Sequence, residues 1–299
     1  MVAAEFSESR VEKFRPRIRS LVDGCISKIE SGPRPIDLVT ALGDPLPAAV
    51  ISEYLGLPDE HREGVRWASS VVFNRYESRE LVAQASLELR RRCMDTLREL
   101  EACPNESLIS RMIRRYEANG AYDRRQMMLH LVSLITAGHE TTSSMLVLSV
   151  LKLLEQPEHI RRRISDPLSA TGLVDELLRY FSVGDVVTSR VLLDDIEIEG
   201  QVMRAGEGVI ALGAAANHDP AVFHQPSEFD PDRRGAEHVA FGFGAHKCIG
   251  KALARVELEE ALSQLFVRLP ELRTSVAGRD ARVSSGSLIH RVESCFVTW

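Results

Sequence analysis

The chain has 299 residues, of which 44% are hydrophobic and 27% are charged, and its formal net charge is −6. That many apolar residues can build a large core, whereas the mild acidity excludes the basic surface typical of nucleic-acid-binding proteins. No apolar run reaches the length of about 18 residues that a membrane-spanning helix needs, and the N-terminus lacks the order of charges and apolar residues in a signal peptide. We therefore expect a cytoplasmic protein with no nucleic-acid or membrane partner.

The first half of the sequence predicts helices. Ser9 and Glu12 match a capping box, with Ser9 as the N-cap, and apolar residues at helical spacing follow as far as Ile29. Further helices are predicted within residues 44–58, 77–102 and 172–181.

The longest apolar and periodic segment covers residues 124–155 and is apolar on more than one face, which predicts a buried helix. Its centre nevertheless contains Gly138, Glu140, Thr141 and Thr142. A glycine costs a helix interior about 1 kcal/mol relative to alanine, and a buried carboxylate needs a partner. Local rules that are broken in the middle of a core indicate a functional site.

The second half of the sequence changes from helical periodicity to the alternating pattern of β-strands. Residues 186–193 and 196–212 alternate between apolar and polar types and contain glycine turns, and residues 287–299 also read as strand. We expect a mainly α-helical fold with a smaller β region (α+β). It would form a single domain over residues 1–299, helix-rich over 1–185 and mixed over 186–299.

Residues 240–250, AFGFGAHKCIG, place one of the five cysteines, Cys248, at the end of a glycine-rich loop and directly before a predicted helix. The odd number of cysteines and the absence of a C-x-x-C pair favour reduced thiols over a disulfide framework. The N-terminus of a helix favours a negative charge, so the position suits a thiolate.

Three alternative interpretations of this region carry less weight. A buried inert thiol would explain none of the neighbouring glycines. A zinc site built from His238, His246 and Cys248 lacks a second pair of ligands at the usual spacing. A serine hydrolase would need a G-x-S-x-G motif, which the sequence does not contain.

Four motifs occur in a fixed order: AGHETT at 137–142, ELLR at 176–179, FDPDR at 229–233 and FGFGAHKCIG at 241–250. Together they resemble the cytochrome P450 monooxygenases, in particular soluble bacterial members, over nearly the whole chain from residue 5 to residue 299. The resemblance implies the cytochrome P450 fold and a haem b cofactor (heme b, iron protoporphyrin IX). It also implies a small-molecule substrate and a ferredoxin or flavodoxin-type electron donor.

By this resemblance Cys248 is the axial thiolate ligand of the haem iron, which suits the cleavage of an O–O bond. Phe241 would shield the proximal face of the haem, and His246 would bind a propionate. Arg190 would bind a propionate as well, the alternative being an exposed arginine on a strand. The remaining expected cofactor-binding residues of the loop are the three glycines Gly242, Gly244 and Gly250, which would let the backbone approach the sulfur and the macrocycle.

The central motif of the long helix supplies the other side of the site. The resemblance assigns Ala137 and Gly138 to the oxygen pocket, and Glu140 and Thr141 to an acid–alcohol pair that delivers protons. The alternative is a buried helix whose hydroxyl groups bond back to its own carbonyls, and Thr142 fits that description. We expect His139 to face away from the site and to pack in the core.

Two further groups follow from the resemblance. Glu176, Arg179 and Arg233 match a buried ion-pair cluster that supports the irregular chain leading to the cysteine loop. Two segments match the lining of the substrate pocket, namely Val183 to Thr188 and Ser287 to Ile289.

About the first hundred residues of the family have no recognisable counterpart before Met1. In the family they cover one edge of the haem, so we expect weaker haem retention in the chain as written. Two function classes therefore stand: a haem-thiolate monooxygenase, and a haem-poor, non-catalytic relative that acts as a binding or partner protein.

Overall fold

The computed structural model describes residues 2–73, 77–184, 189–233, 237–275, 282–284 and 291–299. The described chain is mainly helical, with small antiparallel sheets. The α-helices are α1 (Glu8–Glu30), α2 (Pro45–Leu55), α3 (Asp59–Phe73), α4 (Arg79–Ala102), α5 (Leu108–Ala118), α6 (Arg124–Leu154), α7 (Glu158–Arg162), α8 (Pro167–Phe181), α9 (Gly213–Asn217) and α10 (Lys251–Arg268). Shorter helical turns are η1 (Val2–Phe6), η2 (Val39–Gly43), η3 (Arg163–Ser165) and η4 (Gly244–His246).

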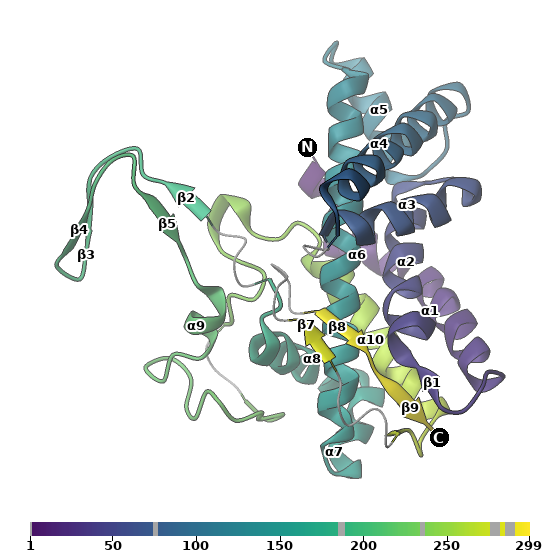
Figure 1. The fold of residues 1–299 in the computed structure, drawn as a ribbon, viewed down its shortest axis with the longest axis vertical. Coiled ribbons are helices and arrows are strands. Elements are labelled where there is room, and N and C mark those ends of the chain that lie inside the picture. The colour runs from purple at the N-terminus through teal and green to yellow at the C-terminus, as the bar shows by residue number, and fades with distance from the viewer. Residues whose placement is uncertain (1, 74–76, 185–188, 234–236, 276–281, 285–290) are drawn as a thin grey trace.

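The strands are β1 (Ile36–Asp37), β2 (Ser189–Val191), β3 (Ile196–Ile198), β4 (Gln201–Met203), β5 (Gly208–Ile210), β6 (Arg273–Thr274), β7 (Arg282–Ser284), β8 (Arg291–Ser294) and β9 (Phe296–Thr298). They form a three-stranded sheet in the order β1-β9-β6 and the pairs β2-β5, β3-β4 and β7-β8, all antiparallel. Figure 1 shows β2–β5 and β3–β4 reaching away from the helical body as a long arm. The expected α+β class is therefore confirmed.

Helix α6 runs through the middle of the helical body and contacts α2, α3, α4, α8 and α10 (Figure 1). Because it has neighbours on several sides, most of its C-terminal half is buried, as its all-round apolar pattern predicts. The helix is continuous through the central AGHETT motif. Among the described residues, no helix combines the length and apolar character needed to cross a bilayer.

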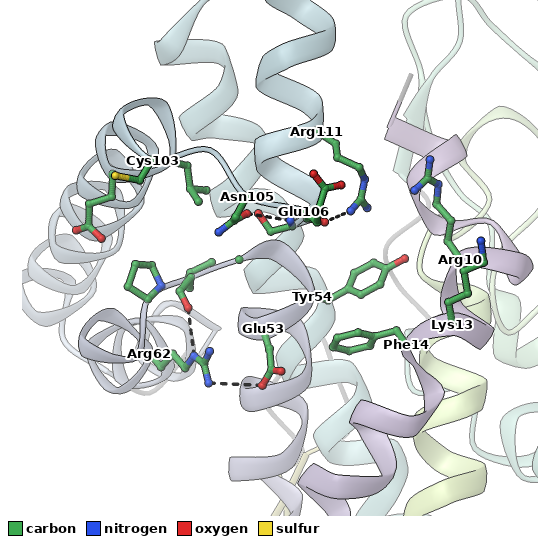
Figure 2. Close-up of a pocket in the computed structure, with 16 residues that line it drawn as sticks. Arg10, Lys13, Phe14, Glu53, Tyr54, Arg62, Cys103, Asn105, Glu106 and Arg111 are labelled. Atoms are coloured by element: carbon green, nitrogen blue, oxygen red, sulfur yellow. Dashed lines mark hydrogen bonds and ion pairs between the residues drawn. The ribbon is translucent and has the colours of Figure 1, made fainter.

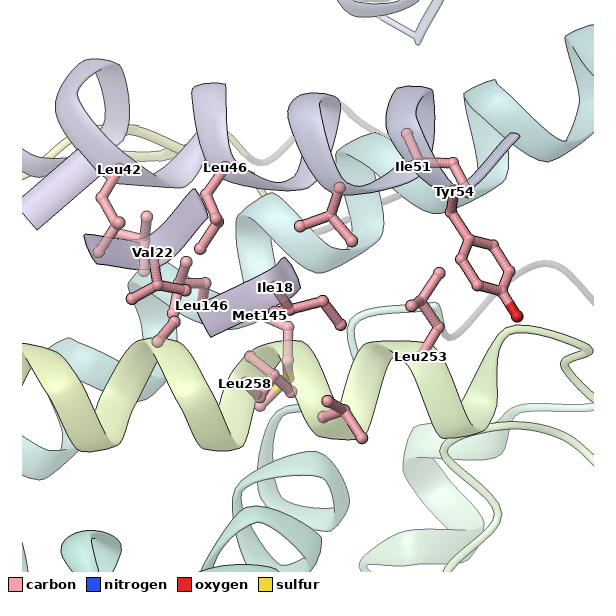
Figure 3. Close-up of a cluster of buried hydrophobic side chains, with 14 of the residues drawn as sticks. Ile18, Val22, Leu42, Leu46, Ile51, Tyr54, Met145, Leu146, Leu253 and Leu258 are labelled. Atoms are coloured by element: carbon pink, nitrogen blue, oxygen red, sulfur yellow. The ribbon is translucent and has the colours of Figure 1, made fainter. Parts of the chain in front are cut away.

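The core lies between α1, α2, α6 and α10. Ile18 and Val22 of α1 project toward the same region as Leu46 of α2, Leu146 of α6 and Leu258 of α10, and all five side chains are fully buried (Figure 3). Burying a side chain of this size stabilises a fold by about 1.5–3 kcal/mol, so this cluster fixes where α10 lies relative to α6. Cys248 lies three residues before the start of α10, so the same packing positions the cysteine loop.

The predicted start of the first helix was wrong. Helix α1 begins at Glu8 after Ser7, and the hydroxyl of Ser7 makes no capping hydrogen bond. Glu12 pairs with Arg15 one turn later instead of reaching back to a cap. The ion pair with arginine competes successfully for the carboxylate, because both partners already lie on the same exposed face.

The interface between α1 and α10 contains two glutamates in different settings. Glu260 receives hydrogen bonds from Arg15 and Arg19 at 2.9–3.1 Å. Glu257, one turn earlier, is 2% exposed, and its Oε1 has no hydrogen-bond partner. Burial alone raises the pKa of Glu257 to about 8. The folded protein therefore holds this carboxyl group in its neutral, protonated form.

We expect Glu257→Gln to remove a pH dependence of stability. Between the ordinary glutamate pKa near 4.5 and about 8, the native state binds a proton that the unfolded state has lost. The free energy of unfolding of the native sequence should therefore fall with rising pH, relative to the variant, by up to about 1.4 kcal/mol per pH unit. Urea denaturation at pH 5, 6, 7 and 8 measures this difference. The exposed Glu271→Gln serves as the control, and parallel pH curves for Glu257→Gln and the native sequence would contradict the expectation.

Candidate functional site

The cysteine loop is a tight turn closed by its own backbone. The N–H of Cys248 donates to the carbonyl of Phe241 at 2.7 Å, and the N–H of Lys247 donates to the carbonyl of Gly244 at 3.1 Å. Gly242 and Gly244 have φ values of 69° and 74°, a region that side chains disfavour. Two of the three predicted glycines are thus required by the path of the backbone.

The thiol of Cys248 lies where the loop passes into α10, whose N-cap is Gly250. Packing around the thiol raises the pKa of Cys248, and hydrogen bonds from the N–H groups of Gly250 and Lys251 pull the pKa down only in part. The helix N-terminus alone therefore does not hold a thiolate at neutral pH. A bound metal ion is the kind of charge that would deprotonate it.

One face of the loop is open. Cys248 and His246 are exposed, and Phe243 is 88% exposed. Phe241 points the other way, because it is half-buried and packs against the core. The structure thus presents Cys248 and His246 on an exposed surface, whereas Phe241 packs against the core.

Ala137 and Thr141 lie one turn apart on the open side of α6. Ala137 is exposed, and the hydroxyl of Thr141 donates to the Ala137 carbonyl at 2.9 Å. The back-bonded hydroxyl considered for Thr142 therefore belongs to Thr141, while Thr142 itself is buried. The Thr141 oxygen still has lone pairs available on the accessible side of the helix.

In the structure Gly138 is required by the packing of two helices, whereas the resemblance assigned it to the oxygen pocket. A Cβ atom at Gly138 would lie 2.9 Å from Cγ1 and 3.0 Å from Cδ1 of Ile51, which is on α2. Such a separation is a clash, so the glycine lets α2 approach α6. The neighbouring Ala137 is the small residue on the exposed side of α6.

Glu140 is buried at 3% exposure, and its Oε1 lies 3.7 Å from Nδ1 of His139. The carboxylate thus lies inside the protein, whereas the expected proton delivery would connect it with solvent. His139 is buried as predicted, with hydrogen-bonding distances of 2.7 Å to the hydroxyl of Ser69 and 3.1 Å to the carbonyl of Asp44. His139 therefore anchors the inner side of α6 to α3 and to the N-cap residue of α2.

Glu176, Arg179 and Arg233 come together as the sequence predicted. The Arg179 guanidinium donates to both carboxylate oxygens of Glu176 at 2.7 and 2.9 Å, and Arg233 donates to the same carboxylate at 3.0 Å. Both arginines also donate to backbone carbonyls of the irregular segment 217–228. One buried ion-pair cluster therefore holds a long stretch of chain without regular structure.

Asn217 is a residue that the sequence did not single out. It is completely buried at 0% exposure at the end of α9. Its Oδ1 accepts a hydrogen bond from the N–H of Val239 at 2.7 Å, and its Nδ2 donates to the hydroxyl of Ser182 at 2.7 Å. Its carbonyl accepts from Arg179. Asn217 therefore joins the ion-pair cluster to the start of the cysteine loop, a role that no local motif reveals.

Asp175 on α8 is a second link that the sequence did not indicate. It forms an ion pair with Arg255 of α10 and lies 3.5 Å from Nε2 of His238. Burial pushes the pKa of Asp175 up, but His238 and Arg255 outweigh it and the pKa is lowered overall. The charged carboxylate ties α8, α10 and the segment before the loop together.

Arg190 lies on β2, in the β2–β5 pair that reaches away from the helical body (Figure 1). It is exposed on β2, and its guanidinium donates to the carbonyl of its neighbour Ser189 at 2.8 Å. Val183, the first residue of the expected pocket segment, is buried. Residues 185–188 and 287–289, which complete the two expected pocket segments, lie outside the described residues.

The residues that are present fit a haem. An accessible sulfur at a helix N-terminus, two glycines with left-handed backbone and an open alanine on α6 are what a flat macrocycle with a thiolate ligand requires. Within the described ranges, no three His, Cys, Asp or Glu residues lie close enough to hold a bare metal ion.

Comparison with known proteins identifies the family of the chain. Residues 170–270 match the family model described as Cytochrome P450. The whole chain aligns with cytochrome P450 105A3 of Streptomyces carbophilus at 36% identity, covering 73% of that protein. It aligns with mycinamicin VIII C21 methyl hydroxylase of Micromonospora griseorubida at 35% identity, covering 76% of that protein.

Among solved structures, cytochrome P450 MoxA from Nonomuraea recticatena is similar over 99% of this chain and 74% of that chain, with a TM-score of 0.92 and 40% identity. The chain belongs to the cytochrome P450 family. It spans about three quarters of the length of these relatives, which agrees with the expected shortfall.

We expect Asn217→Ala to destabilise the protein by about 1–3 kcal/mol, because the Val239 N–H and the Ser182 hydroxyl lose their partner inside the protein. Urea denaturation should show a lower midpoint with an unchanged slope. The exposed Asn119→Ala should leave the midpoint in place. Equal midpoints for Asn217→Ala and the native sequence would show that the asparagine does not support the loop.

Proposed function

We propose that this protein is a haem-thiolate monooxygenase that inserts one oxygen atom of O₂ into a small organic substrate. The overall reaction is RH + O₂ + two electrons + two protons to ROH + H₂O. The observation that carries the proposal is the accessible thiol of Cys248, held by a closed glycine loop at the N-terminus of α10. When bound, a haem with a cysteine ligand supplies the activation of O₂.

The proposed work of the loop is to hold the sulfur in a fixed, partly dry position. The N–H groups of Gly250 and Lys251 point at the thiol and would stabilise its charge after deprotonation. Phe241 lies on the core side of the loop and would keep water away from the proximal face. His246 and Arg190, both exposed, would each offer a hydrogen bond to a propionate.

The proposed work of α6 is to manage protons. Thr141 has its hydroxyl fixed on the Ala137 carbonyl, so its oxygen is directed toward the open side of the helix. Glu140 would be the acid of the acid–alcohol pair, although its carboxylate lies inside the protein, 3.7 Å from Nδ1 of His139. Ala137 would leave room for a small reactant beside the hydroxyl.

The proposed substrate, electron donor and domain organisation rest on the similarity of the chain to its relatives. Mycinamicin VIII C21 methyl hydroxylase and pentalenic acid synthase are named relatives that act on small organic molecules, and we infer a substrate of that class. A ferredoxin or flavodoxin-type protein would supply the electrons. Residues 1–299 would form one domain, which the similarity to MoxA over 99% of the chain supports.

The decisive test is the spectrum of the reduced, carbon-monoxide-treated protein. Cys248→Ala should abolish the band typical of a thiolate ligand, because no other thiol is presented in this way. Cys25→Ala and Cys295→Ala remove thiols that lie half-buried and buried in the core, and should leave the band unchanged. An unaltered band in Cys248→Ala would refute the ligand assignment, and no band in the native protein would favour the haem-poor alternative.

In protein that turns over, Thr141→Ala should keep its haem and lose coupling between electron use and product. Positioned proton transfer typically contributes about 10²–10⁴-fold to a rate, so reducing equivalents should be diverted to hydrogen peroxide. The ratio of product formed to electron donor consumed measures this effect. Thr142→Ala, a change at the neighbouring buried hydroxyl, is the matched control, and equal ratios in both variants would argue against the assignment.

A further inference from the structure

A cavity of about 650 Å³ lies between α1, the end of α2 and the turn that joins α4 to α5 (Figure 2). Sites for small molecules typically have volumes of about 300–1,000 Å³. None of the residues assigned above to the haem site lines this cavity. It is therefore a separate feature of the fold.

The walls of the cavity contain an aromatic pair. Phe14 of α1 and Tyr54 of α2 meet edge to face with ring centroids 5.0 Å apart; Phe14 is partly exposed, whereas Tyr54, Leu57 and Leu100 form the buried floor of the cavity. The Tyr54 hydroxyl donates to the carbonyl of Glu5 at 2.6 Å, which fixes the ring. A flat apolar body could pack against these rings without rearranging them.

The charges around the cavity are unequal. Next to it the single carboxylate of Glu5 lies within 2.8–3.6 Å of three arginines: Arg10, Arg111 and Arg115. One negative charge therefore faces three positive charges. Lys13 also lines the cavity, and in the part of the chain that the structure describes it has no ion-pair partner.

The acids of the lining offset this excess only in part, because two of the three already pair with arginines and the third lies beside a histidine. Glu53 pairs with Arg17 and Arg62, Glu99 lies 2.9 Å from His61, and Glu106 lies 3.2 Å from Arg114. The positive potential is thus concentrated on the side of Arg10 and Lys13. Figure 2 shows these two side chains on α1, beside Phe14 and across from Arg111.

We propose that the cavity binds a small organic anion, with an apolar aromatic body against Phe14 and Tyr54 and a carboxylate or sulfonate beside Arg10 and Lys13. Apolar contact would contribute most of the affinity, and the cations would select the anion over neutral compounds. The site is independent of the haem and of the reaction proposed above.

Cys103, at the C-terminal end of α4, provides a reporter, because it is exposed and lines the cavity. The probe is 2-naphthoate, and the neutral 2-naphthalenemethanol is its matched control. The rate of Cys103 alkylation by iodoacetamide is followed by peptide mass spectrometry in the protein as purified. At about ten times its dissociation constant, naphthoate should slow this reaction roughly tenfold, because only the free site reacts.

The charge requirement is tested with two variants of the same helix. Lys13→Gln should weaken the binding of naphthoate by about fivefold, as expected for the loss of one nearby cation at the surface. Lys28→Gln makes the same change near the other end of α1, outside the cavity, and should leave the affinity unchanged. An unchanged Cys103 rate in the presence of naphthoate, equal protection by the neutral alcohol, or equal affinity in Lys13→Gln would overturn the proposal.

Discussion

The candidate site depends on one buried charge. Arg179 is almost completely inaccessible, and an isolated guanidinium in such a place would be strongly destabilising. Its cost is offset because Glu176 takes two of its hydrogen bonds and backbone carbonyls of the following loop take the others. Most of those carbonyls belong to a segment without regular secondary structure, whose backbone groups therefore need hydrogen-bond partners from elsewhere in the protein. The ion pair therefore organises the chain that leads to Cys248.

The connection continues through neutral groups. Asn217 accepts from the backbone at Val239 and offers its own carbonyl to Arg179, so the cluster and the cysteine loop share one residue. Ser182, which ends α8 with a φ of 42°, holds this unusual backbone by bonding to both Arg179 and Asn217. A strained residue persists only where its surroundings determine it, and here the surroundings are the same network.

A different conflict exists at the thiol. Packing around the sulfur raises the pKa of Cys248, whereas the N–H groups at the N-terminus of α10 lower it, and the pKa is raised overall. In the proposed haem site the metal ion would supply the positive charge that favours the thiolate. Ala137 and Thr141 on α6 likewise present small groups on the open side of the helix.

Periodicity and local chemistry in the sequence determined much of the structure. The apolar pattern predicted the long helix α6 because its side chains are buried on several sides. The glycines before Cys248 predicted a loop leading into a helix, and in the structure two of them adopt left-handed backbone. The pairing of Glu176 with Arg179 was predictable since residues three apart share a helix face. Helices α3 and α5 were not predicted, and the first helix begins earlier than its capping motif suggested.

Tertiary structure decided the rest, because these outcomes depend on groups far apart in the chain. Gly138 is set by Ile51 on another helix, the burial of Glu140 by the packing of α6 against α2 and α3, and the role of Asn217 by the path of a loop that no pattern describes. The cavity beside Phe14 and Tyr54 exists only where three helical segments meet. Sequence patterns show which face of a helix or strand is apolar, but not which other element packs against that face. The packing element decides the role of each polar residue that interrupts the apolar face.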